Sequence, residues 1–135
     1  MIDGIGLSNV DLGQLRHAMP ADIACVQNVY NLLDRTHEPM LTECREHDVA
    51  FVPFFPLGSG FPGARRVTED PVVGATADRT GTSPAQVGLA WLLAHARNIL
   101  LIPGTADVAH LELNIAAGDL VLDDAAISRL DTVCS

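Results

Sequence analysis

The chain has 135 residues, of which 48% are hydrophobic and 19% charged, and its formal net charge is −9. This length and composition fit one globular domain over residues 1–135 and exclude a disordered chain. The acidic balance argues against nucleic acid or an anionic membrane surface as a partner, and no apolar run approaches the ~20 residues of a membrane span.

All eight basic residues are arginine, so the chain contains no lysine. The three cysteines are odd in number and lack metal-site spacing, which indicates reduced thiols. No signal-peptide pattern opens the sequence, so we expect a cytoplasmic protein.

The first part of the chain alternates short apolar runs with helical patterns. Ile5–Leu7 is predicted as a strand, and Asp11–Met19 as a helix with Asp11 as its possible N-cap. Ala24–Val26 is predicted as a second strand. Glu38–His47 follows as a helix that is apolar on one side and charged on the other. Its acidic and histidine side chains are expected to form a solvated face and not a metal site.

The alternation continues from residue 49 onward. Val49–Phe54 is predicted as a third strand, and after a glycine-rich loop come helices over Pro71–Arg79 and Pro84–His95. The second of these begins with Ser83, Pro84 and Gln86, which predicts an N-cap with a capping box. Ile99–Ile102 is predicted as the fourth strand.

Two more helices, Val108–Ala117 and Asp123–Val133, complete the predicted order. Four strand-then-helix units without a linker indicate parallel strands joined by right-handed crossovers. Strands that are continuous apolar runs fit a sheet covered on both faces. An open doubly wound sheet and an arc of a β/α barrel both remain compatible with this pattern.

The glycine-rich loop Gly58–Gly63 reads GSGFPG and matches the dinucleotide pattern G-x-G-x-x-G. That fingerprint should open directly into a helix and be followed about 20 residues later by an acidic residue at a strand end. Here the loop continues through Arg65 and Arg66, and Pro62 has no N–H to offer a phosphate. A flexible surface loop, or a phosphate site in another fold, are the alternatives.

Polar or unusual residues follow each predicted strand. Ligand sites of parallel α/β proteins lie at the carboxyl ends of the strands. The four strand ends read Ser8-Asn9, Gln27-Asn28, Phe54 to Gly58, and Pro103-Gly104-Thr105. We therefore expect a ligand site where these ends converge.

Five segments in this order and spacing resemble the C-terminal half of an aldo-keto reductase. They are IGLSNV, CVQNVYNLLDR, VAFVPFFPLGSG, LAWLLAH and NILLIPGTADVAHLELN. The resemblance implies a partial TIM barrel, with about four parallel strands each followed by helix, that corresponds to strands five to eight of eight. It also implies that the glycine-rich loop folds over the pyrophosphate of NADP(H) and that the G-x-G-x-x-G match is coincidental.

The resemblance assigns cofactor contacts residue by residue. At the nicotinamide end, Ser8, Asn9 and Gln27 match residues that bind the carboxamide, and Phe54 matches the aromatic residue that stacks on the ring. The phosphate and adenosine contacts are matched by Leu57, Gly58 and Ser59 for pyrophosphate, Thr105 and His110 near the 2′-phosphate, and Asn114 at the adenine.

Three positions depart from the family pattern. Gly104 stands where many members have a lysine against the 2′-phosphate, Leu113 where they have an adenine-binding glutamate, and Phe55 where many have serine. Arg65 and Arg66 could supply the missing positive charge, or they could be an ordinary solvated pair.

The family's chemistry uses an aspartate, a tyrosine, a lysine and a histidine from the first four strands of the barrel. The chain has no lysine, and Tyr30, its one tyrosine, matches no catalytic position. A general acid contributes on the order of 10²–10⁴ in rate. We therefore assign no catalytic residue and expect the chain alone to be an incompetent reductase.

A four-strand arc leaves two unpaired edges and an inner face, predicted to include Val26, Val52 and Leu101, without an opposing layer. We expect a complementing N-terminal half or a homo-oligomer, with a small carbonyl substrate only once the barrel is complete. The alternative is a non-catalytic, self-associating structural or nucleotide-binding module. Met1 to Gly4 lead directly into a strand, which suggests a reading frame begun inside an ancestral gene.

Overall fold

Three parallel strands form the sheet in a computed structural model that describes residues 2–134. The strands are β1 (Ile5–Ser8), β2 (Ile23–Gln27) and β3 (Ala50–Phe51), in the order β1-β2-β3. The predicted alternation of strands and helices and their parallel direction are therefore confirmed.

Helices follow the strands as expected. They are α1 (Leu12–Ala18), α2 (Glu38–Glu46), α3 (Pro71–Thr80), α4 (Pro84–His95), α5 (Val108–Ala116) and α6 (Asp124–Asp131). Short 3₁₀ turns lie at Met19–Ala21, Val67–Glu69, Ala117–Asp119 and Thr132–Cys134. Within the described residues, no helix is long and apolar enough to cross a membrane.

The fourth predicted strand, Ile99–Ile102, is wrong as a strand. This segment meets β3 through a single parallel bridge between Phe51 and Ile99, formed by bonds from the Phe51 N–H to the Asn98 oxygen (2.8 Å) and from the Leu100 N–H to the Phe51 oxygen (2.9 Å). β3 itself is only two residues long, and Pro53 has no N–H with which to extend the ladder. The segment thus lies beside β3 in the expected place without a second ladder step.

The helix starts agree with the capping signals. Asp11 accepts a hydrogen bond from the Gln14 N–H at 2.8 Å, and Ser83 accepts one from the Gln86 N–H at 3.2 Å, each with a reciprocal capping box. A side-chain oxygen at the N-cap satisfies an N–H that has no partner inside the helix. These caps fix the point at which the chain turns from each loop into α1 and α4.

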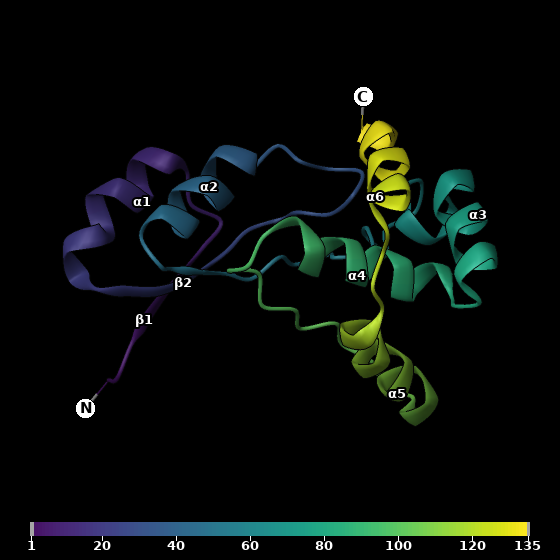
Figure 1. The fold of residues 1–135 in the computed structure, drawn as a ribbon. Helices are drawn as coiled ribbons and strands as arrows, with labels where there is room; N and C mark the ends of the chain where they lie inside the picture. The colour runs from purple at the N-terminus through teal and green to yellow at the C-terminus, as the bar shows by residue number, and fades with distance from the viewer. Residues whose placement is uncertain (1, 135) are drawn as a thin grey trace.

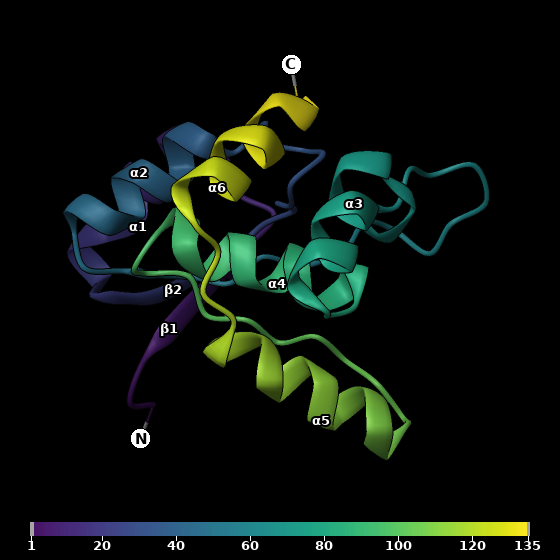
Figure 2. The same cartoon turned by 45° about the vertical axis from the view of Figure 1, so that its right-hand side comes forward.

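The core lies between the strands and the helices packed on them. α1 and α2 lie together on one side of β1 and β2, and α5 lies apart from them on the other side (Figures 1 and 2). Leu15 of α1, Leu41 of α2 and Trp91 of α4 are almost fully buried in one apolar cluster. The sheet is thus covered by helices on the side of α1 and α2.

The predicted exposed inner face is only partly correct. Val26 is fully buried in the same cluster as Leu15, so it is covered by helices, and Val52 is buried as well. Leu101 is half-buried, whereas its neighbours Leu100 and Ile102 are more than half exposed. The apolar surface left open therefore lies mainly along the fourth segment.

Candidate cofactor site

The ends of β1 and β2 bring three of the predicted residues together. Ser8 and Gln27 are register partners at the last positions of their strands, and the Asn9 N–H donates to the Gln27 oxygen at 3.0 Å. Asn9 has a φ of 53°, a left-handed conformation that asparagine tolerates better than most residues. Ser8 and Asn9 are exposed and Gln27 is half-buried, so polar side chains are available at this edge.

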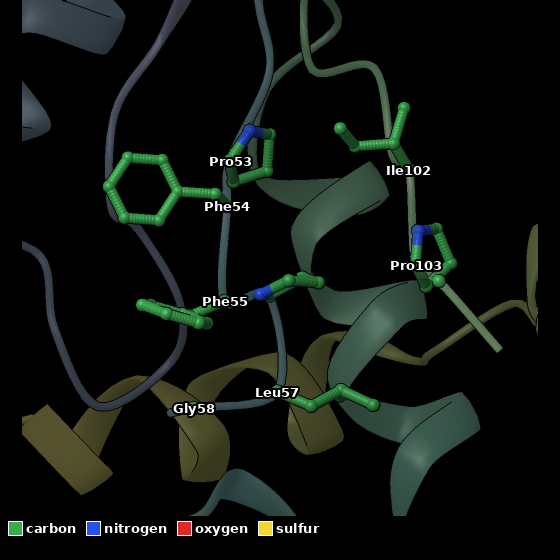
Figure 3. A pocket seen from close by; sticks show the side chains of 9 residues that line it. Pro53, Phe54, Phe55, Leu57, Gly58, Ile102 and Pro103 are labelled. Carbon is green, nitrogen blue, oxygen red and sulfur yellow. The ribbon is translucent and has the colours of Figure 1, made fainter. Parts of the chain in front are cut away.

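Phe54 lies at the neighbouring strand end. It forms an isolated parallel bridge with Val29, and its N–H donates to the Asn28 oxygen at 3.1 Å. The Phe54 and Phe55 rings meet edge to face with centroids 5.3 Å apart. In Figure 3 the Phe54 ring projects to the side of the chain away from Ile102. The ring is half-buried, which leaves part of its surface free.

A pocket of about 370 Å³ opens beside this strand end. One wall is the chain from Pro53 to Gly58, and the other is Ile102 to Gly104 after the fourth segment. The Leu57 side chain extends over the ribbon of α4 (Figure 3), where a Cβ at Gly88 would lie 2.8 Å from Leu57 Cδ2. The lining is mainly apolar, with backbone amides from two loops.

A second pocket of about 320 Å³ adjoins the first and shares Leu57 and Gly104 with it. It is formed by the start of α4 and by α5 with the loop before it. The predicted residues Thr105, His110 and Asn114 line it together with Ser83, Ala85 and Leu113. The two pockets form one groove with Leu57 and Gly58 between its ends.

The glycine-rich loop closes on itself at its base. Gly58 has a φ of +91°, and a Cβ there would lie 2.6 Å from the Arg65 carbonyl oxygen. An antiparallel bridge joins Gly58 to Arg66, and the Val67 N–H donates to the Leu57 oxygen at 3.1 Å. Close approach of the loop's own backbone therefore requires glycine at position 58.

The rest of the loop does not open into a helix as a dinucleotide fingerprint does. A 3₁₀ turn follows it, and α3 begins only at Pro71. The Ser59 hydroxyl accepts a hydrogen bond from the Phe61 N–H at 3.1 Å, so it stabilises a turn inside the loop. The fingerprint match thus has a local cause in the turns of this loop.

The groove contains little charge. His110 is the one titratable side chain among the residues that line the two pockets. The backbone N–H of His110 donates to the Asp107 carboxylate at 3.0 Å, and this hydrogen bond lowers the pKa of Asp107. Such a groove suits binding better than proton transfer.

Arg65 and Arg66 lie on the exposed loop and have acidic neighbours. Arg65 Nη2 is 3.7 Å from Asp70 Oδ2, and Arg66 Nη1 is 3.9 Å from Glu69 Oε1. Both arginine side chains are more than half exposed, as in the solvated-pair interpretation.

Tyr30 lies in a separate buried cluster. Its hydroxyl donates to Glu38 and lies 2.9 Å from His95 Nε2, and its ring stacks near Trp91. Burial, followed by the hydrogen bond to Glu38, raises the pKa of Tyr30 far above its ordinary value. The cluster joins the loop after β2 to α2 and α4 and does not line the groove.

The charged face of α2 is tied to α1. Arg16 binds the Glu43 carboxylate with two guanidinium nitrogens, Nε to Oε1 at 3.0 Å and Nη2 to Oε2 at 2.8 Å. Among residues 2–134, no group of three or more histidine, cysteine, aspartate or glutamate side chains is placed to hold a metal ion.

Sequence reasoning named Asn28 only as part of a polar strand end and did not single out Asn31. Both are buried, and both side chains bind backbone groups of adjacent loops. A polar residue after a strand is common in any turn, so the pattern gave no means of separating these amides from ordinary turn residues.

The chain is similar to known proteins over nearly its whole length. The family model described as "Aldo/keto reductase family" matches residues 1–134. Pyridoxine 4-dehydrogenase of Escherichia coli is 43% identical over 134 residues, covering 98% of this chain and 45% of that protein. Aldo-keto reductase yakc [NADP(+)] of Schizosaccharomyces pombe is 29% identical over 161 residues, covering 96% of this chain and 47% of that protein.

The fold agrees with a solved structure. The thermostable aldo-keto reductase Tm1743, crystallised with the inhibitor epalrestat, superposes with a TM-score of 0.82 at 31% identity. The match covers 96% of this chain and 48% of that one. The chain therefore spans a little under half the length of the proteins it matches.

Proposed function

Since the chain belongs to the aldo/keto reductase family, we propose that it is the NADP(H)-binding half of an oxidoreductase that interconverts carbonyl and alcohol groups. The observation that supports this most strongly is the continuous groove whose two pockets meet at Leu57 and Gly104. Phe54 lies at one end of it and Asn114 at the other. This order follows a dinucleotide from nicotinamide to adenosine.

The residues that line the two pockets fit the ring, pyrophosphate and adenosine portions of such a cofactor, whereas Ser8, Asn9 and Gln27 lie outside both pockets, at the ends of β1 and β2. Ser8, Asn9 and Gln27 would hold the carboxamide, and Phe54 would stack on the nicotinamide ring. Backbone groups of Leu57, Gly58 and Ser59 would meet the pyrophosphate, and Thr105, His110 and Asn114 would surround the adenosine end. Bound NADP(H) would supply or accept the hydride.

No arginine or lysine lines the two pockets, so a 2′-phosphate would have no permanently charged partner in this groove. Arg65 and Arg66 are the nearest candidates by sequence, and each has an acidic neighbour within 4 Å. A phosphate would have to compete with these carboxylates. We therefore propose binding of NADP(H) without a strong preference over NAD(H).

Catalysis would require further residues. The groove lining contains no tyrosine, lysine or carboxylate among the described residues, and its one titratable side chain, His110, lies in the adenosine pocket, so no proton donor lines the pocket at Phe54 where hydride transfer would take place. We propose that a complementing N-terminal half provides the proton donor and closes the barrel. Pyridoxal is the first carbonyl compound to test, because a relative 43% identical is named pyridoxine 4-dehydrogenase.

The open apolar surface supports the need for a partner. Leu100 and Ile102 are 56% and 52% exposed, and Leu111 and Ile115 of α5 are 47% and 68% exposed. They line a further cavity of about 460 Å³ between the fourth segment and α5. Exposed apolar side chains on this extended segment and on α5 favour association with another β/α unit.

Purified chain separates the proposal from its alternative, a non-catalytic, self-associating structural or nucleotide-binding module. We expect calorimetric titration to detect NADPH binding, no reduction of pyridoxal by the chain alone, and activity on co-expression with the first half of a related reductase. Reduction by the chain alone would contradict the missing proton donor. A specific site is expected to bind NADPH with a dissociation constant of about 1 mM or lower. If the chain does not bind NADPH at about millimolar concentration, only the structural alternative remains.

A further inference from the structure

One segment, residues 27–31, lies between the other two strand ends of the candidate site. On one side the Gln27 oxygen accepts the Asn9 N–H at 3.0 Å. On the other side, the backbone carbonyl oxygen of Asn28 accepts a hydrogen bond from the Phe54 N–H at 3.1 Å. The segment therefore sets the spacing between the carboxamide residues and the stacking ring.

The Asn28 side chain extends the contact toward β1. It is only 1% exposed, its Nδ2 donates to the Val10 oxygen at 2.8 Å, and its Oδ1 accepts the Val10 N–H at 3.3 Å. One amide thus satisfies both polar groups of Val10, as a neighbouring strand would. Val10 directly follows Asn9, so this pair of bonds holds the turn that presents Ser8 and Asn9.

The Asn31 side chain makes the matching contact toward β3. It is 4% exposed, its Nδ2 donates to the Phe55 oxygen at 3.0 Å, and its Oδ1 accepts the Leu33 N–H at 2.9 Å. Phe55 has a φ of 53°, a strained conformation for an aromatic residue that persists only with support from its surroundings. Phe55 directly follows Phe54, so the Asn31 bond holds the backbone immediately after the predicted stacking residue.

We propose that Asn28 and Asn31 are positioning residues for the nicotinamide end of the cofactor site, and this rests on the proposed function. Both amides are buried and bonded to backbone, so they act through Ser8, Asn9 and Phe54 and do not meet the ligand. Their contacts reach no residue of the adenosine end. They fix three strand ends in one arrangement before the cofactor arrives.

The location of these contacts gives the test its readout. Replacing Asn28 or Asn31 by alanine should displace the nicotinamide contacts and leave the adenosine contacts in place. We expect Asn28→Ala and Asn31→Ala to weaken binding of NADPH and of reduced nicotinamide mononucleotide about tenfold, as small misplacements of contacts do. Binding of adenosine 2′,5′-bisphosphate should stay within about twofold.

Asn98 provides the matched control. Asn98 is a half-buried residue whose Nδ2 donates to the Val49 oxygen at 3.1 Å, before β3 and away from the strand ends of the site, while its Oδ1 has no hydrogen-bond partner. Asn98→Ala removes one long-range bond from an amide to the backbone, where Asn28→Ala and Asn31→Ala remove two bonds each, and it should leave all three affinities unchanged. A loss of equal size for both half-ligands in Asn28→Ala and Asn31→Ala, or no loss in either, overturns the proposal.

Failure of the proposed function is recognised separately, because wild-type chain would then bind none of the three ligands. Amide hydrogen exchange still tests the amide clamp, by which we mean the hydrogen bonds from the Asn28 and Asn31 side chains to the backbone of the neighbouring strand ends. Exchange at Val10 should accelerate in Asn28→Ala, and exchange at Leu33 in Asn31→Ala, since each loses its acceptor. Asn28→Ser and Asn31→Ser serve if an alanine variant does not fold. Unchanged exchange in folded variants overturns the clamp whatever the ligands show.

Discussion

The Tyr30 hydroxyl lies 2.9 Å from Nε2 of His95, and both groups contact the carboxylate of Glu38. This joins the loop after β2 to the end of α4 and the start of α2. Tyr30 is fully buried, and its ring lies between Phe51 and Trp91. A tyrosine in this position stabilises the core through a neutral hydroxyl.

The raised pKa of Tyr30 predicts the alkaline limit of stability. The pKa of Tyr30 in the folded state lies above the unfolded value of about 10. The stability that the neutral hydroxyl contributes to the free energy of unfolding is therefore complete below about pH 10 and is lost as the pH rises further. Tyr30 is the only tyrosine of the chain, so tyrosinate absorbance reports it alone. We expect ionisation to coincide with loss of circular dichroism. Ionisation of a still folded chain near pH 10 would contradict the burial argument.

Gly58 and Gly60 form a matched pair within the loop. Gly58→Ala places a Cβ against the Arg65 oxygen at a positive φ and should destabilise the loop base by about 1–3 kcal/mol. Gly60→Ala meets no atom within 4 Å and should be neutral. Limited proteolysis at Arg65 and Arg66, with urea unfolding, measures both. Equal behaviour of the two variants would rule out the close approach as the reason for glycine.

The N-cap of α4 has a defined stability effect. Ser83→Ala removes the acceptor for the Gln86 N–H and the capping box, and should lower the free energy of unfolding by about 1 kcal/mol. Ser128→Ala, on the exposed side of α6, is the control and should change little. Urea midpoints compare the two. A Ser83 variant as stable as the control would show that the cap is dispensable.

The Phe54 ring should contribute to cofactor affinity. Phe54→Ala removes the stacking surface, and aromatic contacts are worth about 0.5–1.5 kcal/mol beyond their buried area, so NADPH binding should weaken about threefold to tenfold. Phe61→Ala, whose ring is 69% exposed on the loop, is the comparison and should weaken binding less. Phe54→Leu keeps packing if the alanine variant unfolds. Calorimetric titration measures each; unchanged affinity without Phe54 would remove the ring from the site.

The Arg16–Glu43 pair predicts an acid-dependent difference. The hydrogen bond from Arg16 lowers the pKa of Glu43 in the folded state. Its contribution is therefore present above the unfolded value of about 4.3 and is lost as pH falls through the folded value. Arg16→Gln should be less stable than wild type at neutral pH, with the gap closing below about pH 4 and at high salt. Urea midpoints across this range, with Arg79→Gln in α3 as the control, measure the gap; a gap independent of pH would point to packing.

Local chemistry explains which sequence predictions succeeded. The bounds of α4 and the caps at Asp11 and Ser83 were predictable, because a cap depends on a few adjacent residues. The alternation of strands and helices was likewise visible in the apolar pattern. The apolar pattern did not show which side of the sheet α1 and α2 cover. Val26 was therefore assigned to the wrong face.

The fourth strand and the amide clamp needed three-dimensional information. Ile99–Ile102 has the composition of a strand, but ladder formation depends on how far β3 extends, and β3 stops before Pro53. Asn28 and Asn31 bind residues 18 and 24 positions away, and no local pattern marks such partners. The roles of the ten predicted cofactor residues remain predictions.

α5 has no buried side chain, yet His110 and Asn114 project from it into the groove. Because α5 has no buried side chain to hold it against the rest of the molecule, we expect a ligand at the adenosine end to restrain this helix as well as bind to it. Part of the binding free energy of the nucleotide would then offset the cost of holding α5 in place. Any neighbour that packs on Val108, Leu111 or Ile115 would tighten nucleotide binding from a distance, without contact with the nucleotide.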